Sequence, residues 1–241
     1  MTFKNKKLAI ISVSNKKNID KLAKNLIKND YIILSTGGTA KFLSSNNIKH
    51  ISISKFTDFE EILEGRVKTL HPKIHAGILA KNQSSISALN DDTFALIDMV
   101  IVNLYPFEET ISKKNCTYDQ AIENIDIGGP TMLRAAAKNH QRVTVVTDPD
   151  DYKIVIDELD KNGETSIELR TKLAKKVFEK ISHYDLMIYN YLNKTDEELK
   201  SSLPNSLNIS LVKNCDLRSV SYTHLRAHET DSYLVCRLLL E

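Results

Sequence analysis

Hydroxyl, ammonium and glycine residues gather in two short turns near the start of the chain. The first turn, S-V-S-N-K at 12–16, closes an apolar run that begins at residue 7, and the second, S-T-G-G-T at 35–39, follows an apolar run at 31–34. Paired glycines let backbone N–H groups come close to an oxygen, and phosphate is a common partner for such groups beside hydroxyls and an ammonium. The candidate phosphate contacts are Ser12, Ser14, Lys16, Thr36, Gly37, Gly38 and Thr39. Each turn taken alone is equally well explained as an ordinary helix cap.

The string G-R-V-K-T-L-H-P at 65–72 adds two cations. In an extended segment Arg66 and Lys68 lie on the same side, because successive side chains point to opposite sides. A planar guanidinium beside a compact ammonium suits a phosphate next to an oxygen that gains negative charge during a reaction. His71, directly before Pro72, is interpreted as a turn or core histidine.

The string D-I-G-G-P-T at 126–131 predicts the start of a helix. Asp126 then lies just outside the helix N-terminus, and Lys138 lies near the far end of the helix. An aspartate beside exposed N–H groups can simply be a cap, and a lysine at the far end can complement the helix dipole. Tyr105, directly before Pro106, can equally be a packed turn tyrosine. These three side chains are candidates for chemistry, with the structural alternatives left open.

The apolar pattern predicts an α/β fold that positions these strings. Short apolar runs indicate buried strands, and apolar residues at helical spacing follow them. Strands or apolar strand-like segments are expected at 7–13, 31–34, 50–53, 97–104 and 142–147, and helices from about residues 19, 39 and 149. Alternating strands and helices imply a parallel sheet with helices on both faces and with ligands at the carboxyl ends of the strands.

The last long helix is expected to open with a capping box formed by Thr165 and Glu168. Its apolar stripe is predicted to contain Leu169, Leu173, Val177, Ile181, Tyr184, Ile188 and Leu192. We interpret its tyrosines as core residues, with a neighbouring subunit as the alternative. Residues 193–204 are polar and acidic, which is typical of a linker. After Arg218 the chain contains no lysine and no asparagine, although the rest is rich in both.

The composition excludes several classes of protein. The 241 residues are 41% apolar and 27% charged, and no apolar run is long enough to cross a membrane. A net charge of +2 gives no long-range attraction for nucleic acid. Cys116, Cys215 and Cys236 are too scattered for a disulfide framework or a zinc site. We therefore expect a cytoplasmic protein with neither a membrane nor a nucleic acid as partner.

Six strings, in order along residues 7 to about 218, resemble one enzyme family. They are S-V-S-N-K, S-T-G-G-T-A, G-R-V-K-T-L-H-P-K-I-H-A-G-I-L, N-L-Y-P-F, N-I-D-I-G-G-P-T-M-L-R-A-A-A-K-N-H and Y-D-L-M-I-Y-N-Y. Together they resemble inosine monophosphate (IMP) cyclohydrolase, the N-terminal domain of the bifunctional purine biosynthesis protein, whose other domain is a formyltransferase. The resemblance implies a methylglyoxal-synthase-like fold, a Rossmann-like parallel sheet with helices on both faces.

The implied reaction is the last step of de novo purine biosynthesis. The carboxamide nitrogen of formamidoimidazole carboxamide ribonucleotide attacks the formyl carbon, water leaves, and IMP forms, with neither a metal nor an organic cofactor. The resemblance implies that the catalytic residues are Lys68, Tyr105, Asp126 and Lys138. It implies that the substrate contacts are the phosphate candidates above together with Arg66, Thr69, Asn103, Ile127, Gly128 and Gly129.

The chain departs from the family pattern in two places. Lys17 and Asn18 stand where the family usually has threonine and glycine, and residues 219–241 do not continue the formyltransferase domain. We expect a cyclohydrolase domain at 1–192, a linker and the first formyltransferase residues at 193–218, and a non-native tail at 219–241. Formyltransferase activity is therefore expected to be absent. A homodimer is expected to be weakened by the loss of the C-terminal domain, or replaced by a monomer.

Three other readings remain open. Methylglyoxal synthase shares the fold and binds a small phosphate ester, but it does not account for G-R-V-K-T-L-H-P together with I-D-I-G-G-P-T. A nucleotide-sensing regulatory module needs the phosphate contacts but has no use for the four implied catalytic residues. The third alternative is an inert fragment that does not fold, and it would neither catalyse a reaction nor bind a nucleotide.

Overall fold

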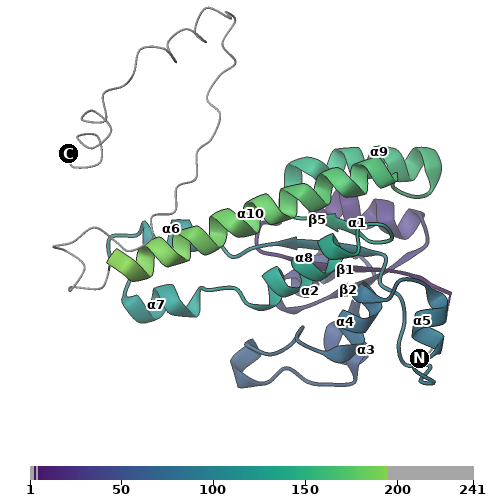
Figure 1. The fold of residues 1–241 in the computed structure, drawn as a ribbon, viewed down its shortest axis with the longest axis horizontal. Coiled ribbons are helices and arrows are strands. Elements are labelled where there is room, and N and C mark those ends of the chain that lie inside the picture. The colour runs from purple at the N-terminus through teal and green to yellow at the C-terminus, as the bar shows by residue number, and fades with distance from the viewer. Residues whose placement is uncertain (1–2, 4, 195–241) are drawn as a thin grey trace, which may run out of the picture. The chain divides into compact units, whose positions relative to one another are not determined.

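Five parallel strands form one sheet at the centre of the structure (Figure 1), a computed structural model that describes residue 3 and residues 5–194. The strands are β1 (Lys7–Val13), β2 (Tyr31–Ser35), β3 (Ile51–Ser52), β4 (Met99–Asn103) and β5 (Thr144–Val146). Their order across the sheet is β3-β2-β1-β4-β5, and every neighbouring pair is parallel. The predicted parallel α/β sheet is confirmed.

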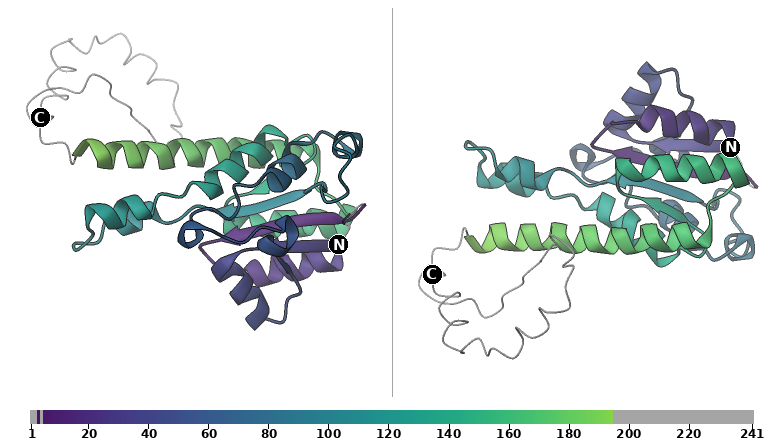
Figure 2. Two further views of the ribbon diagram at one scale, coloured as in Figure 1. Left: turned by 90° about the horizontal axis from the view of Figure 1, so that it is seen from below. Right: turned by 90° about the horizontal axis from the view of Figure 1, so that it is seen from above.

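Helices cover both faces of this sheet (Figure 2). They are α1 (Ile19–Lys28), α2 (Gly37–Ser45), α3 (Ile53–Thr57), α4 (Pro72–Leu79), α5 (Gln83–Ser87), α6 (Phe107–Ile111), α7 (Tyr118–Glu123), α8 (Gly128–Lys138), α9 (Tyr152–Asn162) and α10 (Ile167–Lys194), with short 3₁₀ turns η1 (Leu63–Gly65) and η2 (Pro149–Asp151). Helices α1 and α9 contact each other on one face, and α8 and α10 contact each other on the other. Within the described residues, no helix is both long and apolar enough to cross a membrane.

The chain changes direction across the sheet between β1 and β4. From β1 it steps outward to β2 and β3, and it then returns to the far side of β1 for β4 and β5. Because crossovers between parallel strands are right-handed, this reversal places α1 and α8 on opposite faces. It also opens a crevice at the carboxyl ends of β1 and β4, where Val13 is paired with Asn103. A ligand site is therefore expected at this position.

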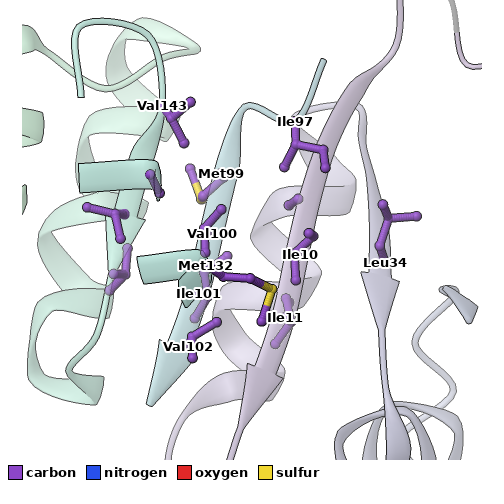
Figure 3. Packing of buried hydrophobic residues seen from close by; sticks show 14 of the residues in the cluster. Ile10, Ile11, Leu34, Ile97, Met99, Val100, Ile101, Val102, Met132 and Val143 are labelled. Carbon is purple, nitrogen blue, oxygen red and sulfur yellow. The ribbon is translucent and has the colours of Figure 1, made fainter. Parts of the chain in front are cut away.

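The sheet is buried on both faces, as a parallel sheet requires (Figure 3). Ile10, Val100 and Ile101 are fully buried, and Met132 from α8 lies against β4. A second, smaller apolar cluster forms where α6 and α7 meet the later part of α10, around Phe107, Ala121 and Tyr184. The core fixes the strand ends, and the second cluster fixes the turns beyond them.

Several details differ from the sequence prediction. The capping box at Thr165 is wrong, because the buried Thr165 hydroxyl pairs with the Thr144 hydroxyl at 2.6 Å, and Ser166 Oγ instead accepts the Leu169 N–H at 3.2 Å. Helix α2 begins at Gly37, two residues before the expected start. Helix α10 continues to Lys194, so residues 193 and 194 are helical, and the rest of the expected linker and tail lies outside the described residues.

Candidate active site

A cavity of about 650 Å³ opens at the carboxyl ends of β1, β2 and β4. Every residue expected to bind substrate lines it: Ser12, Ser14, Lys16, Thr36, Gly37, Gly38, Thr39, Arg66, Thr69, Asn103, Ile127, Gly128 and Gly129. Three of the four implied catalytic residues, Lys68, Tyr105 and Asp126, line the same cavity. These sixteen residues, scattered over more than a hundred positions, thus come together at the crevice between β1 and β4.

Hydroxyl groups tie the two phosphate turns to one another. Thr39 Oγ1 accepts the Val13 N–H and donates to the Val13 carbonyl, both at 3.0 Å, which locks α2 against the end of β1. Ser12 Oγ and Thr36 Oγ1 lie 3.2 Å apart. Ser14 Oγ donates to the Leu104 carbonyl at 2.8 Å, so β4 is held at the same corner. These bonds hold the two turns in place relative to one another.

The N-terminus of α2 faces the cavity without a side-chain cap. Gly37 has φ +45, a left-handed conformation that favours glycine, and a β-carbon on Gly38 would meet nothing within 4 Å. Lys16 Nζ donates to the Val13 carbonyl and to the Ser14 carbonyl, and burial lowers the pKa of this ammonium. Uncapped N–H groups at a helix start, beside an ammonium, form a site that favours an anion.

Lys68 reaches the same place from a hairpin on the other side of the cavity. The hairpin is closed by the bridge between Ile62 and Val67. Lys68 Nζ lies 4.0 Å from the position of a β-carbon on Gly37 and 3.9 Å from that on Gly65. An ammonium at the positive end of a helix is unfavourable unless an anion lies between them. The arrangement is therefore suited to a ligand with a negative group at this point.

The carboxylate of Asp126 is held by backbone N–H groups of other residues. Its Oδ1 accepts the Gly129 N–H at 2.9 Å, and the backbone N–H of Tyr105 also bonds to the carboxylate. Burial raises the pKa of Asp126, and these two hydrogen bonds and the charge of Lys68 offset that rise in part. A carboxylate with a raised pKa inside a cavity is suited to proton transfer.

Close approach explains both glycines that open α8. A β-carbon on Gly128 would stand 2.5 Å from Thr69 Oγ1, and one on Gly129 would stand 2.3 Å from Asp126 Oδ2. Neither contact is sterically allowed. Glycine at these two positions therefore lets Thr69 and Asp126 lie against the start of the helix, at the edge of the cavity.

Arg66 forms an exposed ion pair at the cavity mouth. Its Nε donates to Glu123 Oε1 at 3.2 Å, and its Nη2 pairs with Glu123 Oε2. The segment is not extended here, because Arg66 adopts the right-handed helical conformation that ends η1. Arg66 and Lys68 nevertheless both line the cavity.

Asn103 is fixed at the centre of the crevice. Its Oδ1 accepts the Asn15 N–H at 3.1 Å, and its Nδ2 donates to the Tyr152 hydroxyl at 3.3 Å. Burial raises the pKa of Tyr152 to about 12, which keeps that hydroxyl neutral. The Asn103 amide is therefore held in one orientation.

The structure does not bring Lys138 into the cavity. This lysine is exposed in the last turn of α8, whereas Asp126 precedes the first turn. A helix rises ~1.5 Å per residue, so the backbones of the two ends are roughly 15 Å apart. At the C-terminus of α8, the positive charge of Lys138 complements the helix dipole.

Sequence reasoning missed several residues that line the cavity. Glu123 is the most consequential, because it forms an ion pair with the Arg66 guanidinium. The two residues are 57 positions apart, so no local sequence pattern indicates the pair. Glu64, Ile122 and Ile125 also line the cavity. Within the described residues, no three His, Cys, Asp or Glu side chains are placed to hold one metal ion.

Comparison with known proteins identifies the family. The model of the MGS-like domain matches residues 18–131, and the model described as AICARFT/IMPCHase bienzyme matches residues 136–229. The chain belongs to the AICARFT/IMPCHase bienzyme family. Its MGS-like domain contains most of the cavity described above. The expected fold class and family resemblance are confirmed.

Relatives and a solved structure are similar to most of this chain. The chain is 52% identical over 223 residues to the bifunctional purine biosynthesis protein PurH of Caldicellulosiruptor saccharolyticus, and 47% identical over 224 residues to that of Bacillus cereus. In both, the match covers 92% of this chain but 43% of the relative. A structure titled "Crystal structure of ForH" matches with a TM-score of 0.71 and 32% identity, over 78% of this chain and 97% of that one.

Proposed function

We propose that this chain is an IMP cyclohydrolase that closes the second ring of the purine. The observation that carries this proposal is the meeting of Asp126, Lys68 and Tyr105 in one cavity with the phosphate turns. A purely regulatory nucleotide site would need the phosphate turns alone. The names of the relatives, which refer to purine biosynthesis, support the same conclusion.

The proposed substrate is the formamidoimidazole carboxamide ribonucleotide. Its phosphate would lie at the uncapped N-terminus of α2, near Lys16, where N–H groups and hydroxyls converge. Its imidazole would extend toward Asn103 and the start of α8. This orientation would bring the carboxamide and formyl groups between Asp126 and Lys68.

The reaction forms one C–N bond and breaks one C–O bond. The carboxamide nitrogen attacks the formyl carbon and gives up a proton, while the formyl oxygen gains negative charge. This oxygen takes up two protons, one that originates from the carboxamide nitrogen and one from the formamido nitrogen. As the C–O bond breaks, the formamido nitrogen forms the C=N bond of the ring, so the net products are IMP and water. An amide nitrogen is a poor nucleophile, so the reaction needs a proton acceptor beside the nitrogen and donors beside the oxygen.

In this proposal Asp126 accepts the proton from the carboxamide nitrogen. Its raised pKa makes its ionised form a stronger base than an ordinary aspartate. Lys68 and the hydroxyl of Tyr105, which is 42% exposed at the rim, stabilise and protonate the oxygen. The proposed reaction would take place in the cytoplasm.

The direct test mixes the purified chain with the formamido nucleotide and follows IMP by ultraviolet absorbance. We expect turnover in the unmodified chain and a large loss of kcat in Asp126→Asn. Binding of the nucleotide without turnover would instead indicate a regulatory module. Formation of methylglyoxal from a triose phosphate would indicate the methylglyoxal synthase alternative, and neither binding nor turnover would indicate an inert fragment.

The role of Lys138 is separated by one more variant. If Lys138→Met loses kcat as Lys68→Met does, the catalytic role implied by the family resemblance is supported. If it loses only stability of the folded chain, the helix-dipole role that its position favours is supported.

The expected oligomeric state is a monomer or a weak homodimer. Size-exclusion chromatography at two protein concentrations measures it directly, because a weak dimer elutes later on dilution. The same sample can be assayed for turnover, which shows whether activity depends on association.

A further inference from the structure

Helix α10 reaches the candidate active site through one hydroxyl group. Tyr184 is buried in the second apolar cluster, and its ring packs edge-on against Phe107 with centroids 6.1 Å apart. Its hydroxyl accepts the backbone N–H of Asp126 at 2.9 Å. The contact joins residues 58 positions apart, and nothing in the proposed reaction uses it.

The same hydroxyl also contacts Asn124, two residues before Asp126 in the chain. Tyr184 Oη donates to the Asn124 carbonyl at 3.4 Å while it accepts from Asp126. It therefore bridges an N–H and a C=O that are two residues apart, in the turn between α7 and α8. Burial raises the pKa of Tyr184, so the hydroxyl keeps the proton that it donates.

The bridged turn contains Asp126, which is held through both its side chain and its backbone. The side chain is bonded to the N–H groups of Gly129 and Tyr105, and the backbone is anchored by Tyr184. Ile127, the next residue, is 59% exposed and lies at the cavity edge, so its side chain anchors the turn poorly. Without the Tyr184 hydroxyl, the Asp126 N–H would be left without its partner and the turn would lose its link to α10.

We propose that Tyr184 is a positioning residue that sets the direction of the Asp126 carboxylate toward Lys68 and the reacting nitrogen. This inference rests on the proposed cyclohydrolase function for its kinetic consequences. It assigns a role to the string Y-D-L-M-I-Y-N-Y on α10, which the phosphate turns and the catalytic set leave unexplained. The ring of Tyr184 packs against Phe107, and its hydroxyl positions Asp126.

The groups that act on Asp126 are known from the structure. Lys68 faces it from the hairpin, Tyr105 from the end of β4, and Tyr184 from α10. The hydrogen bonds from Gly129 and Tyr105 stabilise the ionised carboxylate and hold its pKa down. If the turn loosens, these bonds weaken, and the pKa of Asp126 rises further.

The test compares Tyr184→Phe with a matched control on the same helix. Tyr191→Phe also removes a hydroxyl from the second cluster, where the Tyr191 ring packs against Phe107 with centroids 5.8 Å apart. Among the described residues, no hydrogen bond from the Tyr191 hydroxyl is found. Both variants keep their rings, so thermal unfolding of both checks that the fold is retained.

We expect Tyr184→Phe to lower kcat by about 10- to 100-fold, because small displacements of a reacting group have effects of this size. KM for the formamido nucleotide should change less than about twofold, and Tyr191→Phe should match the unmodified chain. In an Asp126→Asn background, Tyr184→Phe should have no further effect on kcat. A loss that persists in that background, or an equal loss in Tyr191→Phe, would overturn the proposal.

A second measurement needs no turnover. Titration of the Asp126 carboxyl carbon by NMR, with Asp126→Asn identifying the signal, should give a higher pKa in Tyr184→Phe than in the unmodified and Tyr191→Phe chains. An unchanged Asp126 titration would contradict the positioning role even if the chain had no activity. An inactive unmodified chain with a shifted titration would instead contradict the proposed function alone.

Discussion

The ammonium of Lys68 lies 4.0 Å from the point where a β-carbon on Gly37 would stand, so the hairpin and the start of α2 meet across the cavity. The Lys68 ammonium is positively charged. The N-terminus of α2, which begins at Gly37 without a side-chain cap, carries a partial positive charge. Their approach is favourable when a negative group lies between them. This relationship links the phosphate turns to the residues proposed for the chemistry.

Lys68→Met should therefore lose activity rather than stability. The variant keeps the length of the side chain but removes the charge, and the loss of one such donor costs about 10² to 10³ in kcat. The measurement is steady-state kinetics of IMP formation. Lys41→Met is the matched control, because Lys41 is exposed on α2 and outside the cavity lining. Equal kcat values in the two variants would remove Lys68 from the mechanism.

Glu123→Gln should improve binding of the nucleotide. Glu123 holds the Arg66 guanidinium at the cavity mouth and so competes with a phosphate for it. The pair is exposed, so its interaction free energy is small, and we expect KM to fall only about two- to fivefold at low salt. The effect should shrink as salt screens the charges.

Glu109→Gln is the control for this change in net charge, since Glu109 is exposed on α6 and outside the cavity lining. A rise in KM for Glu123→Gln would show that the pair orients Arg66 for binding instead of competing with the ligand. The same fall in KM in both variants would show a general effect of net charge.

Two glycines of the site should respond differently to alanine. In Gly129→Ala the new β-carbon would meet Asp126 Oδ2 at 2.3 Å, so the carboxylate must move, and we expect kcat to fall about 100-fold. In Gly38→Ala the β-carbon meets nothing within 4 Å, so the folded chain should keep its stability. Any effect of Gly38→Ala should appear in KM, because Gly38 lies in the phosphate turns. Kinetics and urea unfolding of the two variants measure both quantities.

The phosphate turns could be predicted from sequence because their position follows from chain order. Each turn directly follows an apolar strand, and parallel strands carry their carboxyl ends to one edge. Gly37 and Gly38 also indicated the site, because glycine is needed where a ligand must approach the backbone. The site residues at 12–16 and 35–39 were therefore all found in the cavity.

The remaining features depend on contacts between distant residues. The Arg66 to Glu123 pair and the Tyr184 to Asp126 bond join positions 57 and 58 apart, and side-chain reach across space leaves no local pattern. The capping box at Thr165 failed for a similar reason, because the buried hydroxyl of Thr144 takes the place of the expected partner. Lys138 is correctly predicted near the far end of a helix, but its sequence position does not show which direction that end faces.

Asp126→Asn should make the chain less active and more stable at neutral pH. Burial raises the pKa of Asp126 in the folded chain above its ordinary value of 3.8, so the folded state holds this proton more tightly than the unfolded state. Stability that comes from this group is therefore present at low pH and lost as pH rises through the raised pKa. Asparagine removes the buried charge and keeps an oxygen that can accept the Gly129 N–H.

Urea unfolding as a function of pH tests this argument. The free energy of unfolding of Asp126→Asn should exceed that of the unmodified chain at pH 7, and the difference should shrink below the ordinary pKa of 3.8. Turnover of the unmodified chain should fall as pH drops through the raised pKa, because the ionised carboxylate is the proton acceptor. A variant that is less stable at pH 7 would show that the contacts of the carboxylate with Lys68, Gly129 and Tyr105 outweigh its burial.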